Sequence, residues 1–263
     1  MTVGSGEVVF RMGQAPCTGV GIRWTDEELN AALNGPVGAV LFDDEGKALI
    51  AKSLQGVADS EFANENLRRL MEGPESIKDW RVGEAIAEAY LVSHRKCTFP
   101  WPTGRDEKRR GSSLPGADLV GFGTDSEGHC FAFGEVKTSS EAKYPPGAMY
   151  GSGGLKQQLE DLCNNVSSRN DLVKYLLFRS TSVPWKKQFE RALQRFLNNN
   201  SDCQLYGCLV RDVKPHCDDL RVRVASLGTG CPVGTRIELL AIYLPHSRLD
   251  GIGAQILQRR RPN

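Results

Sequence analysis

Three residues near the middle of the chain have types and spacing that could support chemistry. Glu135 and Lys137 stand one residue apart at the end of the apolar run FAFGEVK, and Asp118 precedes a second apolar run, LVGFG. Side chains alternate between the two faces of a strand, so Glu135 and Lys137 share a face with Phe131 and Phe133. Two phenylalanines on that face argue against the simplest alternative, an exposed cross-strand salt bridge that would contribute about 0–1 kcal/mol.

A turn between the two runs predicts how these residues meet. Residues 124–128 (TDSEG) favour an antiparallel hairpin in which Phe122 pairs with Phe131, and this register places Asp118 opposite Glu135. Facing carboxylates repel each other by up to about 1 kcal/mol when exposed and by more when buried, unless a cation lies between them. Oxygen ligands suit Mg²⁺, and a neighbouring lysine can hold a water molecule or steady a phosphate oxygen. The pattern therefore indicates metal-assisted hydrolysis of a phosphodiester.

The segments PGAD (115–118) and EVK (135–137) together resemble the motifs of the PD-(D/E)XK nuclease superfamily, which has the restriction-endonuclease-like fold. The resemblance implies an α/β fold with a mixed β-sheet core flanked by helices, to which this chain adds an N-terminal α/β extension. It also implies that Asp118 and Glu135 bind Mg²⁺ or Mn²⁺ and that Lys137 is the catalytic lysine.

Members of this superfamily often add an acidic residue from a helix ahead of the hairpin. Glu84 and Glu88 lie four residues apart in an expected helix at 74–95, and both are candidate catalytic residues. Glu84 is preferred as the third metal ligand because GEAIAEAYL resembles that helix. The sequence departs from the family in two places. Two residues separate the proline from the aspartate, and the glutamines at 157 and 158 have no tyrosine four residues later.

The resemblance implies a metal-dependent nuclease that hydrolyses DNA phosphodiester bonds as the effector of a bacterial restriction or anti-phage defence system. The layout, with E-x-K near residue 136 in a chain of 263 residues, is also similar to the nuclease subunits of the Hachiman anti-phage defence systems. That similarity implies a helicase or related ATPase partner that engages the DNA. Two alternatives stay open: a catalytically inactive nuclease-fold subunit that binds nucleic acid or a partner protein, and an unrelated α/β protein. The intact set of Asp118, Glu135 and Lys137 argues against an inactive copy.

The elements around the hairpin are predicted from periodicity and capping. Helices are expected where apolar residues recur every three to four positions, and Thr25 followed by Glu28 is a capping-box pattern. Residues 171–180 fit either a strand or a helix. The expected helices are 25–35, 58–74, 74–95, 155–169 and 182–200, and the expected strands are 6–12, a hairpin within 37–51, 203–210, 220–227 and 236–244.

Two loops are candidates for contact with nucleic acid. The glycines of YGSGG (150–154) precede an expected helix, where backbone N–H groups together with Lys156 and Gln158 could bind a DNA phosphate; a plain flexible loop is the competing interpretation. The aromatic loop FPWP (99–102) could stack on bases, or could simply cover the core. Local basic clusters could add phosphate contacts, and they lie at 94–96, 105–110, 186–187 and 259–261.

Length and composition bound the remaining possibilities. The 263 residues, 40% apolar and 25% charged, are typical of a globular protein, here divided into an N-terminal segment, 1–73, and a nuclease-like domain, 74–263. A net charge of +1 excludes a uniformly basic nucleic-acid-binding chain. No stretch has the pattern of a signal peptide or the length of a membrane span, so a cytoplasmic location is expected. Eight scattered cysteines match no common zinc spacing and are expected to be reduced thiols.

Overall fold

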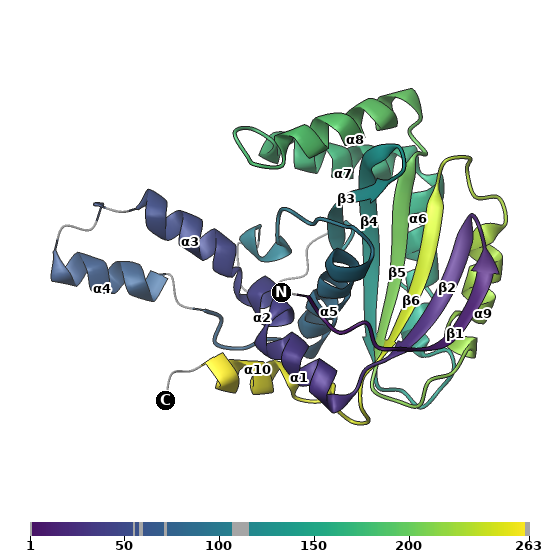
Figure 1. Ribbon diagram of the computed structural model, residues 1–263, viewed down its shortest axis with the longest axis horizontal. Coiled ribbons are helices and arrows are strands. Elements are labelled where there is room, and N and C mark those ends of the chain that lie inside the picture. The colour runs from purple at the N-terminus through teal and green to yellow at the C-terminus, as the bar shows by residue number, and fades with distance from the viewer. Residues whose placement is uncertain (1, 55, 58–59, 71–72, 107–115, 261–263) are drawn as a thin grey trace.

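A six-stranded mixed β-sheet forms the centre of the protein in a computed structural model, which describes residues 2–54, 56–57, 60–70, 73–106 and 116–260 (Figure 1). The strands follow the order β1-β2-β6-β5-β4-β3. The four inner strands are parallel, and β1 and β3 pair antiparallel at the two edges. The strands are β1 (Glu7–Gln14), β2 (Cys17–Arg23), β3 (Leu119–Asp125), β4 (Gly128–Ser139), β5 (Cys203–Arg211) and β6 (Arg236–Tyr243).

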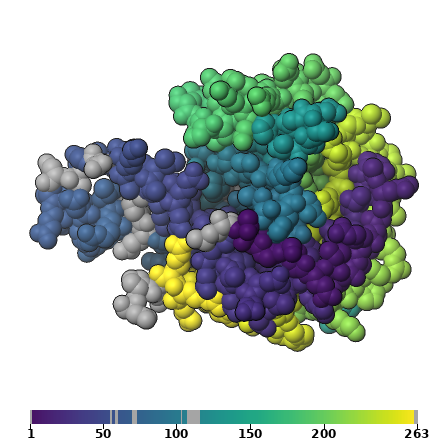
Figure 2. Space-filling model, in the orientation of Figure 1, coloured from purple at the N-terminus to yellow at the C-terminus, as the bar shows by residue number. Residues whose placement is uncertain are grey.

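Helices cover both faces of this sheet, which confirms the predicted α/β class with a mixed sheet flanked by helices. One face packs against α1 (Asp26–Asn34), α2 (Pro36–Phe42), α5 (Asp79–His94) and α10 (Ile252–Arg260). The other packs against α6 (Leu155–Asn164), α7 (Val166–Arg179), α8 (Lys186–Asn198) and α9 (Asp218–Gly228). Two further helices, α3 (Asp44–Ser53) and α4 (Glu61–Leu70), stand out from the main body, and Figure 2 shows them as a projecting arm. Short 3-10 turns occupy Thr103–Arg105 and Gly147–Met149.

Alternation along β4 divides its side chains between the two cores. Ala132 and Val136 belong to the core under α5, whereas Phe131 and Phe133 belong to the core under α6 to α8. Glu135 therefore points to the same side as the two phenylalanines, as the sequence predicted.

The capping box predicted for the first helix is present. The Thr25 Oγ1 accepts a hydrogen bond from the Glu28 N–H (3.2 Å), and the Glu28 carboxylate accepts one from the Thr25 N–H (2.9 Å). These reciprocal bonds satisfy two N–H groups that the first turn of a helix leaves without intrahelical partners. The helix begins at Asp26 for this reason.

The predicted hairpin within residues 37–51 is wrong, because this segment forms α2 and α3. Pro36 occupies the first turn of α2, where its missing N–H costs no hydrogen bond. Val37 and Phe42 are buried in the core that α5 also lines. The supposed turn is a joint between helices: Asp43 ends α2 in the left-handed conformation (φ 46°) and accepts a hydrogen bond from the Gly46 N–H (3.1 Å).

The predicted strand at 220–227 is also wrong, because these residues lie in α9. Leu220, Val224 and Leu227 are buried while Arg221 and Val222 are exposed, which is the spacing of one helix face. The alternation of apolar and charged residues in LRVRV is compatible with a strand only over five positions. The longer pattern follows the helical period.

The helix expected at 155–169 is divided at Asn165, where the extended backbone ends α6 and the Asn165 side chain caps α7 by accepting from the N–H groups of Ser167 and Ser168. The remaining predicted elements are observed with shifts at their ends. Residues 171–180 are resolved as helix, since α7 extends to Arg179. The helix expected at 58–74 is seen as α4, with residues 58–59 and 71–72 outside the described part of the chain. Strands β1 and β2 from the segment 1–73 join the same sheet as β6, so this segment contributes to the sheet of 74–263.

Candidate active site

The β3–β4 hairpin brings Asp118 and Glu135 together at one edge of the sheet. Phe122 pairs with Phe131, as predicted, and the ladder continues to Leu119 opposite Gly134. Asp118 is the next residue, and its Oδ2 accepts a hydrogen bond from the Val136 N–H (2.8 Å). This bond fixes the Asp118 carboxylate beside the Glu135 side chain, of which only 3% is exposed.

Burial and mutual repulsion dominate the electrostatics of this pair. Burial raises the pKa of the Glu135 carboxyl, and the adjacent Asp118 charge raises it further, whereas Lys137 opposes the shift. Burial also raises the pKa of Asp118, against the effect of the Val136 N–H and of Lys137. The Lys137 Nζ lies 4.0 Å from Glu135 Oε2, and this oxygen is buried without a hydrogen-bond partner among the described residues. A buried carboxylate oxygen in this state favours a proton or a cation as its neighbour.

The two acidic candidates on α5, Glu84 and Glu88, differ in their ion pairs and in the cavities that they line. Glu84 forms an ion pair with Arg81 (2.6 Å). Glu88 lies one turn further on, where burial is the main reason that its pKa rises to about 8; Glu84 adds to the shift and Arg81 opposes it. Both glutamates and Asp118 line a cavity of about 20 Å³. Only Glu88 of the two also lines the much larger cavity that Asp118 and Glu135 share, as far as the described residues show.

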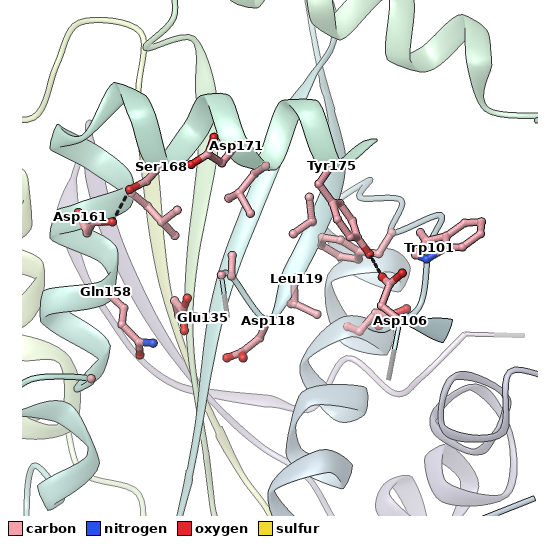
Figure 3. A pocket seen from close by; sticks show the side chains of 18 of the residues that line it. Trp101, Asp106, Asp118, Leu119, Glu135, Gln158, Asp161, Ser168, Asp171 and Tyr175 are labelled. Carbon is pink, nitrogen blue, oxygen red and sulfur yellow. Dashed lines mark hydrogen bonds between the residues drawn. The ribbon is translucent and has the colours of Figure 1, made fainter. Parts of the chain in front are cut away.

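That larger cavity has a volume of about 810 Å³ and lies between the hairpin, the loop 99–106, α6 and α7 (Figure 3). Its volume falls in the range of small-molecule and cofactor sites. Carboxylates dominate its charge: the described lining has one guanidinium, Arg179, against Glu88, Asp106, Asp118, Glu135, Asp161 and Asp171. This lining favours cations over anions.

Helix α6 forms the wall of the cavity next to Glu135. In Figure 3 the Gln158 side chain extends from α6 toward Glu135, and its Oε1 is buried without a hydrogen-bond partner among the described residues. Asp161 is held one turn later by the Ser168 hydroxyl, which donates to its Oδ2 (2.6 Å). Lys156, the other predicted nucleic-acid contact, instead pairs with Glu160 (2.6 Å) and is not among the described residues of the lining.

The opposite wall consists of residues that the sequence did not identify as a group. The Tyr175 hydroxyl and the Arg179 guanidinium, both from α7, donate to the two oxygens of Asp106 (2.6 and 2.7 Å). These two bonds are the principal causes that lower the pKa of Asp106, against the opposing effect of burial. The Arg179 guanidinium lies 3.8 Å from the centre of the Tyr175 ring and 5.5 Å from that of Trp101. Loop 99–106 and α7 are thus joined by a charged and aromatic network.

If residues 171–180 are taken as a helix, the sequence indicates which side chains of this segment line the wall together. Ser168, Asp171, Tyr175 and Arg179 recur every three to four residues, so they share one face of a helix. A strand over the same residues would have divided them between two faces. Because the sequence pattern fits either a strand or a helix here, it does not predict that these four residues lie on one face.

Two histidines, on α5 and β4, lie within hydrogen-bond distance of other groups of the protein. His94 Nε2 lies 3.0 Å from the Val3 carbonyl oxygen, and His129 Nδ1 lies 3.0 Å from the Thr124 hydroxyl. Pro115 and residues 107–110 and 261 of the basic clusters lie outside the described residues. The eight cysteines are free thiols, six of them buried.

A second group of possible metal ligands lies at the start of α9. His216, Cys217 and Asp218 have ligand atoms within 4.8 Å of one another. The Arg221 guanidinium already contacts two of them, Asp218 Oδ1 at 2.5 Å and Cys217 Sγ at 3.0 Å. The Arg221 side chain therefore already supplies a positive charge to these ligand atoms. The group is a weaker candidate for a metal site than the carboxylates of the large cavity.

The donors at Asp118, Glu135 and Glu88 fit a hard divalent cation. All three are carboxylates, the ligand type that Mg²⁺ and Mn²⁺ prefer, and one of their oxygens is buried without a hydrogen-bond partner among the described residues. Comparison of the sequence with models of known protein families finds no match, and neither does comparison with curated protein sequences. None of the helices in the described part of the chain combines the length and apolar character needed to cross a membrane.

Proposed function

We propose that this protein is a metal-dependent nuclease that hydrolyses DNA phosphodiester bonds at the β3–β4 hairpin. The observation that carries the proposal is the buried contact of Asp118 with Glu135 at the cavity wall, with the Lys137 Nζ 4.0 Å from a Glu135 oxygen that has no hydrogen-bond partner among the described residues. A buried like-charge pair is costly in a protein that makes no use of it. The resemblance of these residues to the PD-(D/E)XK motif supports the same chemistry.

Each residue of the group has a task that follows from its position. Asp118 and Glu135, with Glu88 as the α5 residue that shares their cavity, would hold Mg²⁺ or Mn²⁺; Glu84 is the alternative from α5. When bound, the metal would supply Lewis acidity toward a phosphate oxygen and lower the pKa of water. The Val136 N–H keeps the Asp118 carboxylate oriented toward the site.

Lys137 provides the one ammonium group of the motif. Its side chain is 21% exposed and lies beside Glu135, so its charge can balance a phosphate oxygen or hold the attacking water. Arg81 adds positive charge from α5, since it lowers the pKa of both Glu88 and Asp118. These two cations moderate the repulsion between the carboxylates and an approaching phosphate.

The biological setting that we propose is a bacterial restriction or anti-phage defence system. The resemblance to PD-(D/E)XK nucleases, including the Hachiman nuclease subunits, supports this setting and a helicase or ATPase partner. The charge distribution is in keeping with such a partner, because a net charge of +1 and an acidic cavity give the chain little general attraction for DNA. The same surface would suit a protein that acts on DNA delivered by another subunit.

A cleavage assay tests the proposal directly. Purified protein is incubated with supercoiled plasmid, linear duplex and single-stranded DNA in Mg²⁺, in Mn²⁺ and in EDTA. We expect cleavage that requires metal and that falls by at least about a hundredfold in Lys137→Ala and in Glu135→Gln. The matched control is Lys52→Ala, which removes an exposed lysine on α3 and is expected to cleave like the parent.

Two results would contradict the proposal. Equal cleavage by the parent and by Lys137→Ala would exclude the hairpin as the active site. Absence of cleavage in every form, in the presence of the partner ATPase, would leave the inactive nuclease-fold subunit as the better description.

A further inference from the structure

The end of the large cavity formed by loop 99–106 and α7 is built from aromatic rings and a guanidinium. Trp101 and Tyr175 are both half-buried and both line the cavity. The Arg179 guanidinium lies against both rings, and its charge is balanced by Asp106 at 2.7 Å. Because its cation is neutralised, this end of the cavity attracts planar groups more than phosphates.

Apolar side chains connect this aromatic end to the carboxylates. Leu119, Val120 and Leu172 line the cavity between the two, and Leu119 directly follows Asp118 in the chain. Figure 3 shows Leu119 between Asp118 and the network of Tyr175 with Asp106. The cavity therefore has a polar end suited to a cation and an apolar, aromatic end. A single nucleotide has the same two parts, since its charged phosphate would lie with the cation and its planar base with the aromatic rings.

The size of the cavity restricts what can enter it. A volume of about 810 Å³ suits a ligand of small-molecule size. A nucleotide can enter such a space only when its base is unpaired, because a paired base remains stacked inside the duplex. Aromatic rings and arginine planes are the groups on which unpaired bases stack.

We propose that Trp101, Tyr175 and Arg179 bind one unpaired base of the strand whose phosphate lies at Asp118 and Glu135, so that the substrate is single-stranded or locally unpaired nucleic acid. This inference rests on the proposed nuclease function, since that function places the phosphate. It gives a role to the aromatic loop 99–102 and to the network with Asp106.

A binding experiment on the whole protein tests the inference without requiring cleavage. Fluorescence anisotropy is measured with a labelled 12-nucleotide dT strand, the same strand with abasic sites, and a 12-base-pair duplex, in Ca²⁺, and a gel verifies that each probe stays intact. We expect the dT strand to bind at least about fivefold more tightly than the abasic strand and the duplex. Tyr175→Leu, which removes the ring, should weaken dT binding by about five- to 150-fold, so that dT and abasic strands bind alike.

The matched control is Tyr175→Phe, which keeps the ring and removes the hydroxyl that donates to Asp106. It should retain the preference for the dT strand over the abasic strand. A merely structural role for the network predicts the opposite: Tyr175→Phe and Tyr175→Leu would both lower the melting temperature and weaken dT and abasic binding equally.

The outcomes separate this inference from the proposed function. Base-dependent binding that is lost in Tyr175→Leu supports the base site even if Mg²⁺ produces no cleavage, in which case the nuclease proposal alone fails. Metal-dependent cleavage with equal affinity for dT and abasic strands overturns the base site alone. Absence of binding to the single strand at every concentration used also overturns it.

Discussion

Replacing Glu88 by glutamine should stabilise the metal-free protein at alkaline pH. Glu88 lies in α5 on the wall of the large cavity, and burial raises its pKa from an ordinary value of 4.5 to about 8. The folded protein therefore holds a proton on this carboxyl that the unfolded chain releases. For a carboxyl with a raised pKa, stability is complete below the unfolded value and is lost as the pH rises through the folded value. Glu88→Gln removes this loss because an amide does not titrate.

The magnitude follows from the two pKa values. The interval between 4.5 and about 8, at about 1.4 kcal/mol for each pH unit, sets a ceiling of about 5 kcal/mol on the stability lost by pH 8. Glu88 faces a cavity rather than a closed core, so screening reduces the effect, and we expect about 1–3 kcal/mol. Glu88→Gln should exceed the parent in free energy of unfolding by this amount at pH 8 and by little at pH 4.5.

Urea denaturation in EDTA at pH 4.5, 6, 7 and 8 measures this difference. The control is Glu27→Gln, which changes an exposed carboxylate on α1 and should give a curve parallel to that of the parent. If free energies of unfolding for Glu88→Gln and the parent stay parallel from pH 4.5 to 8, then Glu88 is ionised in the folded protein and the reasoning fails. Added Mg²⁺ should stabilise the parent more at pH 8 than at pH 4.5, because the metal favours ionised carboxylates.

Two further predictions concern the framework around the site. Asp219→Ala should lower the free energy of unfolding by about 3–5 kcal/mol, because it removes the carboxylate that lies 2.6 Å from the fully buried guanidinium of Arg211. The control Asp218→Ala breaks an exposed ion pair one residue away and should lower the free energy of unfolding by about 0–1 kcal/mol. Equal losses for the two variants in urea denaturation would refute the distinction. Thr25→Ala should lower the free energy of unfolding by about 1 kcal/mol through loss of the bond from the Glu28 N–H, and an unchanged urea midpoint would show that this cap contributes nothing.

The central part of the site could be predicted from the sequence because the contacts that form it are local. A short turn joins β3 to β4, so the register that pairs Phe122 with Phe131 also determines that Asp118 lies beside Glu135. The first helix was predictable for the same reason, since its capping box involves residues three positions apart. Where a few neighbouring residues decide the geometry, the sequence pattern is sufficient.

Prediction failed where distant segments decide the structure. The run at 37–42 has the apolar content of a strand, but Val37 and Phe42 are buried in the core that α5 lines and the run folds as helix α2. Asp43, read as part of a turn, is paired with Arg105, more than sixty positions away. No local pattern contains this pairing, and the tertiary contact outweighs the intrinsic preference of the segment.

The contrast between two kinds of buried charge supports a functional interpretation of the cavity. Away from it, the buried Arg211 guanidinium is bonded to Asp219, and the buried Arg169 guanidinium donates to the carbonyls of Leu162 and Cys163 (both 2.6 Å). In the cavity, by contrast, Glu135 is buried beside another carboxylate, and its Oε2 lies 4.0 Å from the Lys137 Nζ and has no hydrogen-bond partner among the described residues. Two carboxylates in contact at the wall of a cavity, with a lysine beside them, are the arrangement expected of a site that binds a cation.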